Sequence, residues 1–204
     1  MATAAGLQVV KGTDMQKRDD RVTKDSLKLL IDGKLPWDDV KKMIRLTPKD
    51  ADRFWKYLEV LQEKVTWKEK ILLRISDHLY IVAKKGGRVV KCDCGQEFGD
   101  YRVNWKLSCR VYVRKTRQEM AEVVSIEEAV PNADLVEMRE FYCPGCLALL
   151  GVEVVPVGYP VIFEMMPDLD TFYRDWLGKP LPDERPDWFQ DKTADLPAQW
   201  VKER

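Results

Sequence analysis

The first third of the chain has hydrophobic residues at helical spacing. One helix is expected over residues 24–32 and ends at Gly33, and a second opens at Pro36. A third begins at the Thr47-Pro48 pair and runs to about Lys64. The residues expected on the buried faces are Leu27, Leu30 and Ile31 in the first helix, Val40, Met43 and Ile44 in the second, and Phe54, Leu58, Leu61 and Val65 in the third.

From Ile71 onward the hydrophobic pattern changes to the short, branched runs and period-two alternation of β-strands. A hairpin is expected around Gly86 and Gly87, which form its turn. Residues 117–128 read as a short helical or irregular interruption. The expected strands are ILLRI, LYIVAKK and RVVKCDC, then WKLSCRVYVRK with Leu107, Cys109, Val111 and Val113 on one face, and finally LVEMREFYC and LALLGVEVVPV.

Four cysteines lie where these strands turn. Cys92 and Cys94 form one close pair and Cys143 and Cys146 the other, with 48 residues between the pairs. Two such pairs can supply the four thiolates of a tetrahedral zinc site, and strands entering and leaving each pair are typical of a zinc ribbon. A site filled by four protein sulfurs has no position for a reacting water, so we expect it to be structural.

Other interpretations of the cysteines stay open. Four buried thiols in a strand-rich core are the alternative to a metal site, and iron is a possible occupant of a four-thiolate site, although zinc is favoured. The first pair has one intervening residue, a tight spacing that Gly95 can relieve, and Leu147 stands where a knuckle usually has glycine. Cys109, the fifth cysteine, is expected to be a small hydrophobic residue in a core or half-buried sheet.

The C-terminal part is expected to hold one short helix and a tail. Asp168 or Asp170 can cap the helix, and Gly178 ends it. The residues beyond it are rich in proline and charge and include Trp188 and Trp200. Tryptophans in a segment without its own core are typical anchors on another protein, so we expect a partner-binding tail. The alternative is a tail that folds back on its own domain.

Composition narrows the class of protein. The 204 residues include 34 Lys or Arg and 34 Asp or Glu, and 45% are hydrophobic, as in an ordinary soluble protein. No segment resembles a signal peptide or a membrane span, and paired cysteines that hold metal suit a reducing compartment, so a cytoplasmic location is expected. These patterns predict an α+β protein with N-terminal helices, a β-rich zinc-ribbon-like domain with two cysteine knuckles, a short C-terminal helix and an extended tail.

The expected organisation has four parts. A flexible arm covers residues 1–22, a helical segment 23–67, a zinc-binding β domain 68–160, and the C-terminal helix with the partner-binding tail 161–204. No catalytic residue is predicted. His78 is the single histidine and reads as an ordinary surface or sheet residue, and the chain has no phosphate-binding loop, dinucleotide fingerprint or nucleophile elbow.

Nucleic-acid binding is the alternative function. Basic and aromatic residues alternate from Arg102 to Arg117, a pattern that suits nucleic acid but is also one face of a half-buried strand. The net charge of zero removes the general electrostatic argument for a nucleic-acid partner, which is therefore not expected. A zinc-ribbon nucleic-acid module remains the alternative.

Several motifs occur along the chain in a characteristic order. They are LTPKDADRFWKYLEVLQEKVTWKEKI, CDCG, NWKLSCRVYVR, REFYCPGC, YPV and FYRDWLG. In this order they resemble the gamma (small) subunit of acetone carboxylase, over about three quarters of the chain from Lys24 to Gly178. The NWKLS and FYxxWLG segments have no generic structural reason to occur together, so the resemblance is specific.

The resemblance implies a non-catalytic subunit of an ATP-dependent, C–C bond-forming ligase. Larger alpha- and beta-type carboxylase subunits in the same hetero-oligomer are expected to bind ATP and a divalent metal, and to join bicarbonate and a ketone into a 3-oxo acid. At the matching positions the family's zinc thiolates fall on Cys92, Cys94, Cys143 and Cys146. A subunit of a related hydantoinase-type carboxylase or hydrolase with another carbonyl substrate stays open.

Overall fold

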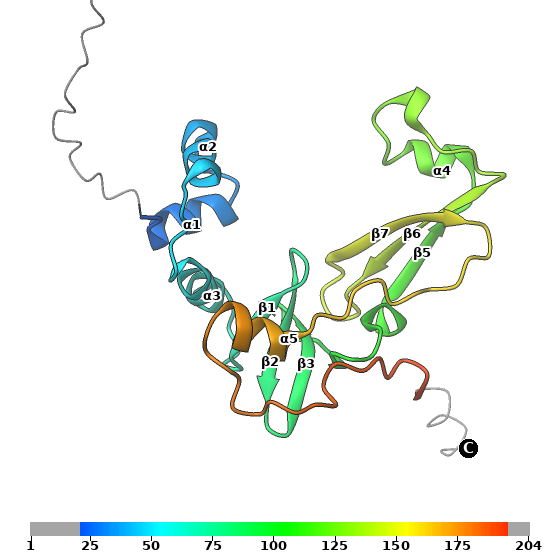
Figure 1. Cartoon of the computed structure of the whole chain (residues 1–204). Helices are drawn as coiled ribbons and strands as arrows, with labels where there is room; N and C mark the ends of the chain where they lie inside the picture. The colour runs from blue at the N-terminus through cyan, green and yellow to red at the C-terminus, as the bar shows by residue number, and fades with distance from the viewer. Residues whose placement is uncertain (1–20, 196–204) are drawn as a thin grey trace, which may run out of the picture. The chain divides into compact units, whose positions relative to one another are not determined.

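A computed structural model describes residues 21–195 of the chain (Figure 1). Most of the predicted flexible arm at 1–22, and Trp200 in the predicted tail, lie outside the described residues. The chain divides into two compact units between Lys56 and Tyr57, and each is described by itself. The helices are α1 (Lys24–Ile31), α2 (Trp37–Arg45), α3 (Arg53–Lys64), α4 (Arg117–Ala121) and α5 (Leu169–Thr171), with short helical turns η1 (Trp105–Ser108), η2 (Glu127–Ala129) and η3 (Phe172–Trp176).

Within residues 21–195, seven strands accompany these helices and form two antiparallel sheets. Sheet A has the order β1-β2-β3-β4 and sheet B the order β5-β6-β7. Helices segregated from antiparallel sheets define an α+β protein, which confirms the predicted fold class. The strands are β1 (Ile71–Arg74), β2 (Leu79–Lys84), β3 (Gly87–Cys92), β4 (Glu97–Asp100), β5 (Arg110–Arg114), β6 (Val136–Tyr142) and β7 (Leu149–Pro156).

The first unit begins with α1, whose start is fixed by later residues of the same unit. The Thr23 side chain caps the helix by accepting a hydrogen bond from a backbone N–H of its first turn. The Val22 N–H donates to the Asp50 carboxylate at 2.9 Å, and Lys56 Nζ donates to the Val22 carbonyl at 3.1 Å. Leu27, a residue of this helix, is buried, as predicted.

The predicted buried stripe of α2 is wrong. No residue of this helix is buried, and its two largest apolar side chains, Trp37 and Ile44, are 67% and 62% exposed. Ion pairs such as Lys42 with Asp39, at 2.8 Å, lie on the polar face. The spacing of Val40, Met43 and Ile44 correctly predicts an amphipathic helix. It does not show whether the apolar face of that helix packs against another element.

α3 begins later than predicted, at Arg53. Residues 47–52 make a turn-rich approach in which the Asp50 carboxylate pairs with Arg53 at 3.4 Å as well as accepting the Val22 N–H. Leu58 and Leu61 are buried, as the spacing predicts. The error at the helix start arises because these residues make tertiary contacts that a local capping pattern does not reveal.

Sheet A forms the core of the second unit. β2 pairs with β3 from Leu79 opposite Cys92 to the turn beside Gly87. The turn residues are Lys85 and Gly86, not the two glycines predicted, and Gly86 supplies the positive φ of 84° that a two-residue turn requires. Four consecutive residues of β2 are buried, so both faces of this strand are covered.

Sheet B begins later than predicted. The predicted strand starts at Trp105, but Trp105–Ser108 form the turn η1 and β5 starts at Arg110. The Asn104 side chain accepts the Lys106 N–H at 3.2 Å, a local bond that competes with strand formation. Cys109 is half-buried, as predicted, with its sulfur 3.6 Å from the Trp105 carbonyl oxygen.

Trp105 also contacts both sheets. Its ring centroid lies 6.5 Å from that of Phe98 on β4 and 6.3 Å from that of Phe141 on β6, both edge to face. The terminal ring carbon is close enough to β7 that a Cβ added at Gly151 would lie 3.4 Å from it. The indole therefore fills the space between the sheets.

The C-terminal helix packs on sheet A. Asp168 caps α5 by accepting the Thr171 N–H at 3.1 Å, and Gly178 ends the helical segment with a φ of 64°, both as predicted. Tyr173 is buried and its hydroxyl donates to the Leu72 carbonyl of β1 at 2.8 Å. Within the described residues, no helix is long and apolar enough to cross a lipid bilayer.

The tail beyond Gly178 corrects one prediction. Trp188, predicted to anchor on another protein, is only 3% exposed and packs against its own chain. Its ring lies 4.4 to 4.7 Å from three guanidinium groups, and its carbonyl accepts the Tyr101 hydroxyl at 3.0 Å. The tail folds back because Arg88 of β3, and Tyr101 and Arg102 directly after β4, supply the pocket that the indole occupies. The three guanidinium groups belong to Arg88, Arg102 and Arg185.

Candidate metal centre

The first cysteine pair sits at the hairpin between β3 and β4. Cys92 is the last residue of β3, and Cys94 lies in the turn that follows. The turn is closed by the Gly95 N–H, which donates to the Cys92 carbonyl at 2.9 Å, and by the Cys92 N–H, which donates to the Gln96 carbonyl at 2.8 Å. Gly95 has a φ of 99°, so glycine relieves the tight spacing as predicted.

The second pair occupies the hairpin between β6 and β7. Cys143 directly follows β6, and Cys146 lies in the turn before β7. The Leu147 N–H donates to the Cys143 carbonyl and the Cys143 N–H to the Ala148 carbonyl, each at 2.9 Å. Leu147 takes the left-handed conformation, with a φ of 60°, at the position where a knuckle usually has glycine.

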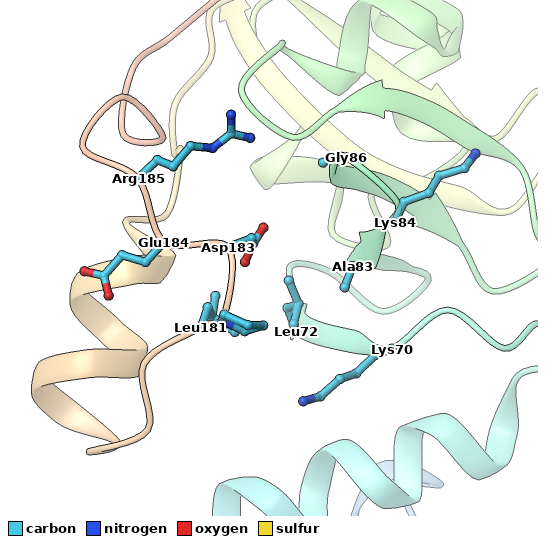
Figure 2. A pocket seen from close by; sticks show the side chains of 11 residues that line it. Lys70, Leu72, Ala83, Lys84, Gly86, Leu181, Asp183, Glu184 and Arg185 are labelled. Carbon is cyan, nitrogen blue, oxygen red and sulfur yellow. The ribbon is translucent and has the colours of Figure 1, made fainter.

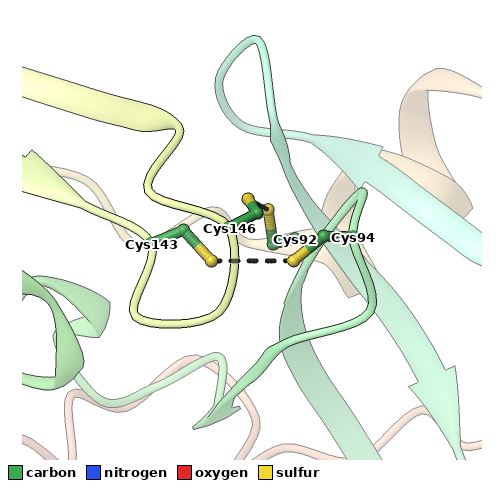
Figure 3. A group of neighbouring side chains, drawn as sticks. All are labelled: Cys92, Cys94, Cys143 and Cys146. Carbon is green, nitrogen blue, oxygen red and sulfur yellow. Dashed lines mark hydrogen bonds between the residues drawn. The ribbon is translucent and has the colours of Figure 1, made fainter.

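The two hairpins bring all four predicted ligands together (Figure 3). The four sulfur atoms lie within 4.8 Å of one another. Cys92 Sγ is 3.8 Å from Cys146 Sγ, and Cys94 Sγ is 3.7 Å from Cys143 Sγ. A regular tetrahedron with metal–sulfur bonds of about 2.3 Å has edges of about 3.8 Å, so this donor set fits a tetrahedral thiolate site.

Burial and hydrogen bonding distinguish the four thiols. Cys92 and Cys143 are fully buried, whereas Cys94 and Cys146 are exposed. Burial raises the pKa of the Cys92 and Cys94 thiols. Burial also acts to raise the pKa of Cys143, but backbone N–H groups of Cys146 and Gly145 donate to its sulfur and the net pKa is lowered. Burial raises the pKa of Cys109, outside the cluster, to about 12.

The cluster joins two separate hydrogen-bonded sheets. Each close sulfur pair combines one cysteine from sheet A with one from sheet B. The hairpins also touch at Gly145, where an added Cβ would lie 3.3 Å from the Gln96 side chain and 3.5 Å from Cys94 Sγ. Glycine between the second pair of cysteines therefore allows this close approach of the hairpins.

Leu147 gives a test of the second knuckle. We expect Leu147→Gly to leave the stability unchanged or raise it by up to about 1 kcal/mol, because it relieves left-handed strain at a side chain that is already 58% exposed. Leu147→Val is expected to cost about 1 to 2 kcal/mol, since a branched Cβ tolerates positive φ poorly. Urea unfolding of the metal-loaded variants measures both, and a glycine variant less stable than the valine variant would contradict the assignment.

His78 lies beside the first knuckle and not among the four sulfurs. Its Nδ1 atom is 2.6 Å from the Asp93 carboxylate, and its carbonyl accepts the Asp93 N–H at 3.0 Å. The pairing of β2 with β3 brings the two residues together, because Leu79, which follows His78, lies opposite Cys92. His78 thus lies in the bend before β2 with its side chain partly exposed, as an ordinary surface residue, and its contact with the knuckle is not marked by any local sequence pattern.

Trp67, in the linker between α3 and β1, is a second neighbour of the knuckle that the sequence did not reveal. Its indole N–H lies 3.1 Å from the carbonyl oxygens of both Cys92 and Asp93. The linker is polar and has no periodic pattern, and 24 residues separate Trp67 from Cys92. No local signal marks such a contact.

Comparison with known proteins decides the family. The sequence model of the acetone carboxylase gamma subunit matches residues 65–177. An acetone carboxylase gamma subunit from Xanthobacter autotrophicus is 42% identical over 163 residues, which cover 79% of this chain and 96% of that protein. The chain belongs to the acetone carboxylase gamma subunit family.

A more distant similarity extends the comparison. An acetophenone carboxylase beta subunit from Aromatoleum aromaticum is 31% identical over 80 residues, which cover 39% of this chain and 62% of that protein. Both relatives are subunits of carboxylases, as their names state. The family match at residues 65–177 includes all four clustered cysteines, so the candidate metal centre of this acetone carboxylase gamma family member lies inside the shared region.

Proposed function

We propose that this chain is the zinc-binding small subunit of an ATP-dependent ketone carboxylase that converts acetone or a related ketone and bicarbonate into a 3-oxo acid. Cys92, Cys94, Cys143 and Cys146 hold the zinc. The observation that carries the proposal is the four-sulfur cluster inside the region shared with the acetone carboxylase gamma subunits. The larger alpha- and beta-type subunits bind ATP and a further divalent metal ion.

The zinc has a structural role in this proposal. With four thiolate ligands it keeps no open position for water or substrate, so it supplies folding energy and no chemistry. The chain contributes a rigid junction of two sheets to the assembly. Thiols stay reduced in the cytoplasm, which makes that compartment the proposed site of action.

Two exposed apolar side chains of α2 support a place in a hetero-oligomer. Trp37 and Ile44 are both more than half exposed, and large exposed apolar groups mark surfaces that other proteins cover. These side chains are compatible with contact to a larger subunit.

Purification from the native host tests the proposal. The tagged chain, isolated under mild conditions from cells grown on a ketone, is expected to bring two larger subunits in fixed ratio and one zinc per chain. The complex is expected to hydrolyse ATP only with both ketone and bicarbonate. A chain that arrives alone, or one that shows carboxylase activity alone, would contradict the proposed role.

The acetophenone carboxylase similarity supports a second candidate substrate. A subunit related to an aromatic-ketone carboxylase is compatible with a complex that acts on a bulkier ketone than acetone. Assays of the purified complex with acetone, butanone and acetophenone at equal concentration separate the candidates, because ATP hydrolysis is expected to follow the preferred ketone.

The alternative of nucleic-acid binding loses its main support. Three of the basic residues of the alternating segment, Arg102, Lys106 and Arg114, form ion pairs. Arg102 pairs with Asp100 at 2.6 Å, and Arg114 with Glu140 at 3.2 Å. Lys106 is buried and pairs with Glu153 and with Glu164. Cations already neutralised by carboxylates do not provide the free positive surface that phosphate binding requires.

A further inference from the structure

The two cysteine knuckles differ in how their backbones are supported. In the second knuckle, backbone N–H groups of Gly145 and Cys146 donate to the Cys143 sulfur, so a pair with two intervening residues supports itself. The first pair has only Asp93 between its cysteines, and the backbone N–H groups of Cys94 and Gln96 donate to the sulfurs of Cys92 and Cys94. Its backbone carbonyls receive, in addition, a donor from outside the hairpin.

That donor is Trp67. Its indole N–H is shared between the carbonyl oxygens of Cys92 and Asp93, at 3.1 Å from each. The Cys92 carbonyl also accepts the Gly95 N–H at 2.9 Å, so both of its lone pairs are used. The indole thereby fixes the orientation of the two peptide groups that lie between the paired sulfurs.

The indole ring is itself held in place. Its Cδ1 atom would lie 3.7 Å from a Cβ added at Gly95, so the ring rests against the turn. The Tyr80 ring packs edge to face at 5.8 Å, and Lys91 Nζ lies 5.2 Å from the indole centroid. Lys91 is fixed in turn by an ion pair of 2.6 Å with Glu69 of the linker.

α3 secures the linker that carries Trp67. The Gln62 side chain donates to the Trp67 carbonyl at 3.4 Å and accepts the Ile71 N–H at 3.1 Å. A single side chain near the end of α3 therefore holds the linker at Trp67 itself and at Ile71, the first residue of β1. The sequence of contacts runs from the helix through the linker to the peptide groups of the knuckle.

We propose that Trp67 is a positioning residue for the metal centre, which pre-forms the tight Cys92–Cys94 knuckle by donating to its carbonyls. The inference rests on the proposed zinc site. Groups that orient metal ligands from outside the ligand set typically account for a 10- to 100-fold change in metal affinity when they are removed. Trp67 acts on peptide groups and not on a sulfur, so it sets the spacing of the sulfurs without ligating the metal.

The test compares Trp67→Phe with Trp55→Phe in the full-length chain. Both variants remove the indole N–H of a half-buried tryptophan, but Trp55 lies in the first unit and contacts Phe54. Zinc competition with a chromophoric chelator is expected to show roughly 10- to 100-fold weaker binding for Trp67→Phe, and less than about threefold change for Trp55→Phe. Cobalt(II) in place of zinc is expected to give shifted ligand-field bands only in Trp67→Phe.

Three results would overturn the inference. Wild-type affinity and cobalt spectrum in Trp67→Phe would show that the indole does not position the knuckle. Equal losses in both variants would show a general packing effect. A wild-type chain that binds no stoichiometric zinc would refute the metal assignment together with the inference, whereas the first two results leave the zinc site intact.

Gln62→Leu provides a second variant if Trp67→Phe does not fold. It keeps the indole but removes the two hydrogen bonds that hold the linker at Trp67 and at Ile71. Its zinc release to excess chelator is expected to be several-fold faster than in the wild type, with stoichiometry unchanged. A wild-type release rate would contradict the proposed role of the linker.

Discussion

Cys94→Ser and Cys143→Ser are each expected to leave the second unit poorly folded. The sheets belong to separate hydrogen-bond networks, and the four sulfurs join the hairpin at the end of β3 to the hairpin at the end of β6. The apparent binding free energy of a structural zinc is about 10 to 16 kcal/mol, which equals or exceeds the typical stability of a domain, about 5 to 15 kcal/mol. Loss of the metal is therefore large enough to unfold the junction.

Hydrogen exchange of the metal-loaded and chelated chain measures this effect directly. Amides of β3, β4, β6 and β7 next to the knuckles are expected to lose protection on chelation and to regain it when zinc is restored. Near-ultraviolet circular dichroism should change in parallel, because Trp105 lies between the sheets. An unchanged exchange pattern after complete zinc removal would contradict a structural metal.

Cys109→Ala is the matched control. This thiol is half-buried and outside the cluster, so its loss is expected to cost about 1 to 2 kcal/mol, as a small core truncation does. The variant should keep one zinc per chain. Equal damage from Cys94→Ser, Cys143→Ser and Cys109→Ala would mean that the ligands are assigned wrongly.

The cysteine cluster was predictable because it depends on local patterns. Strand periodicity places each cysteine pair at the end of a strand, and the structure has Cys92 at the end of β3 and Cys143 directly after β6. The helical spacing in α1 and α3 likewise marks buried Leu27, Leu58 and Leu61. Side-chain chemistry and period are properties of neighbouring residues, so one sequence is sufficient to show them.

Two of the errors concern contacts with segments elsewhere in the fold, and one is local. The apolar face of α2 has the right spacing, but Val40 and Met43 are only half-buried and Ile44 is exposed. The local error is the turn at Trp105, which replaces a predicted strand because Asn104 bonds to the local backbone. The sequence predicts that Trp188 binds another protein, because the tail has no hydrophobic core of its own. Its pocket is formed by arginines far away in sequence, which no local pattern connects to it.

Arg88→Met is expected to destabilise the second unit by about 3 to 5 kcal/mol and to release the C-terminal tail. The Arg88 side chain is completely buried, 2.5 Å from Asp170 and 3.1 Å from both carboxylate oxygens of Asp183. Burial acts to lower the pKa of Arg88, but the hydrogen bonds that it donates to Asp183 and Asp170 raise the pKa overall, so the side chain is charged. Removing it leaves the buried Asp170 carboxylate without its cation, which is the costly way to break a buried ion pair.

Asp170 and Asp183 are expected to contribute differently to the free energy of unfolding. The Asp170 side chain is 9% exposed and the Asp183 side chain 41% exposed, so Asp183→Asn should cost less than about 1 kcal/mol. Arg88→Met combined with Asp170→Asn should recover much of the loss of the single Arg88 variant, because no unpaired charge remains buried. Urea unfolding of the wild type, Arg88→Met, Asp170→Asn and the combined variant completes this double-mutant cycle.

Release of the tail provides an independent readout of the same interaction. The Arg88 guanidinium lies 4.7 Å from the Trp188 ring, and Asp183, which it binds, precedes that tryptophan in the tail. Arg88→Met should therefore increase proteolytic cleavage beyond Gly178 and shift Trp188 emission to longer wavelength. If Arg88→Met destabilises the protein while the tail stays protected, the arginine serves sheet A and α5 alone, and the packing of the tail depends on Arg102 and Tyr101 instead.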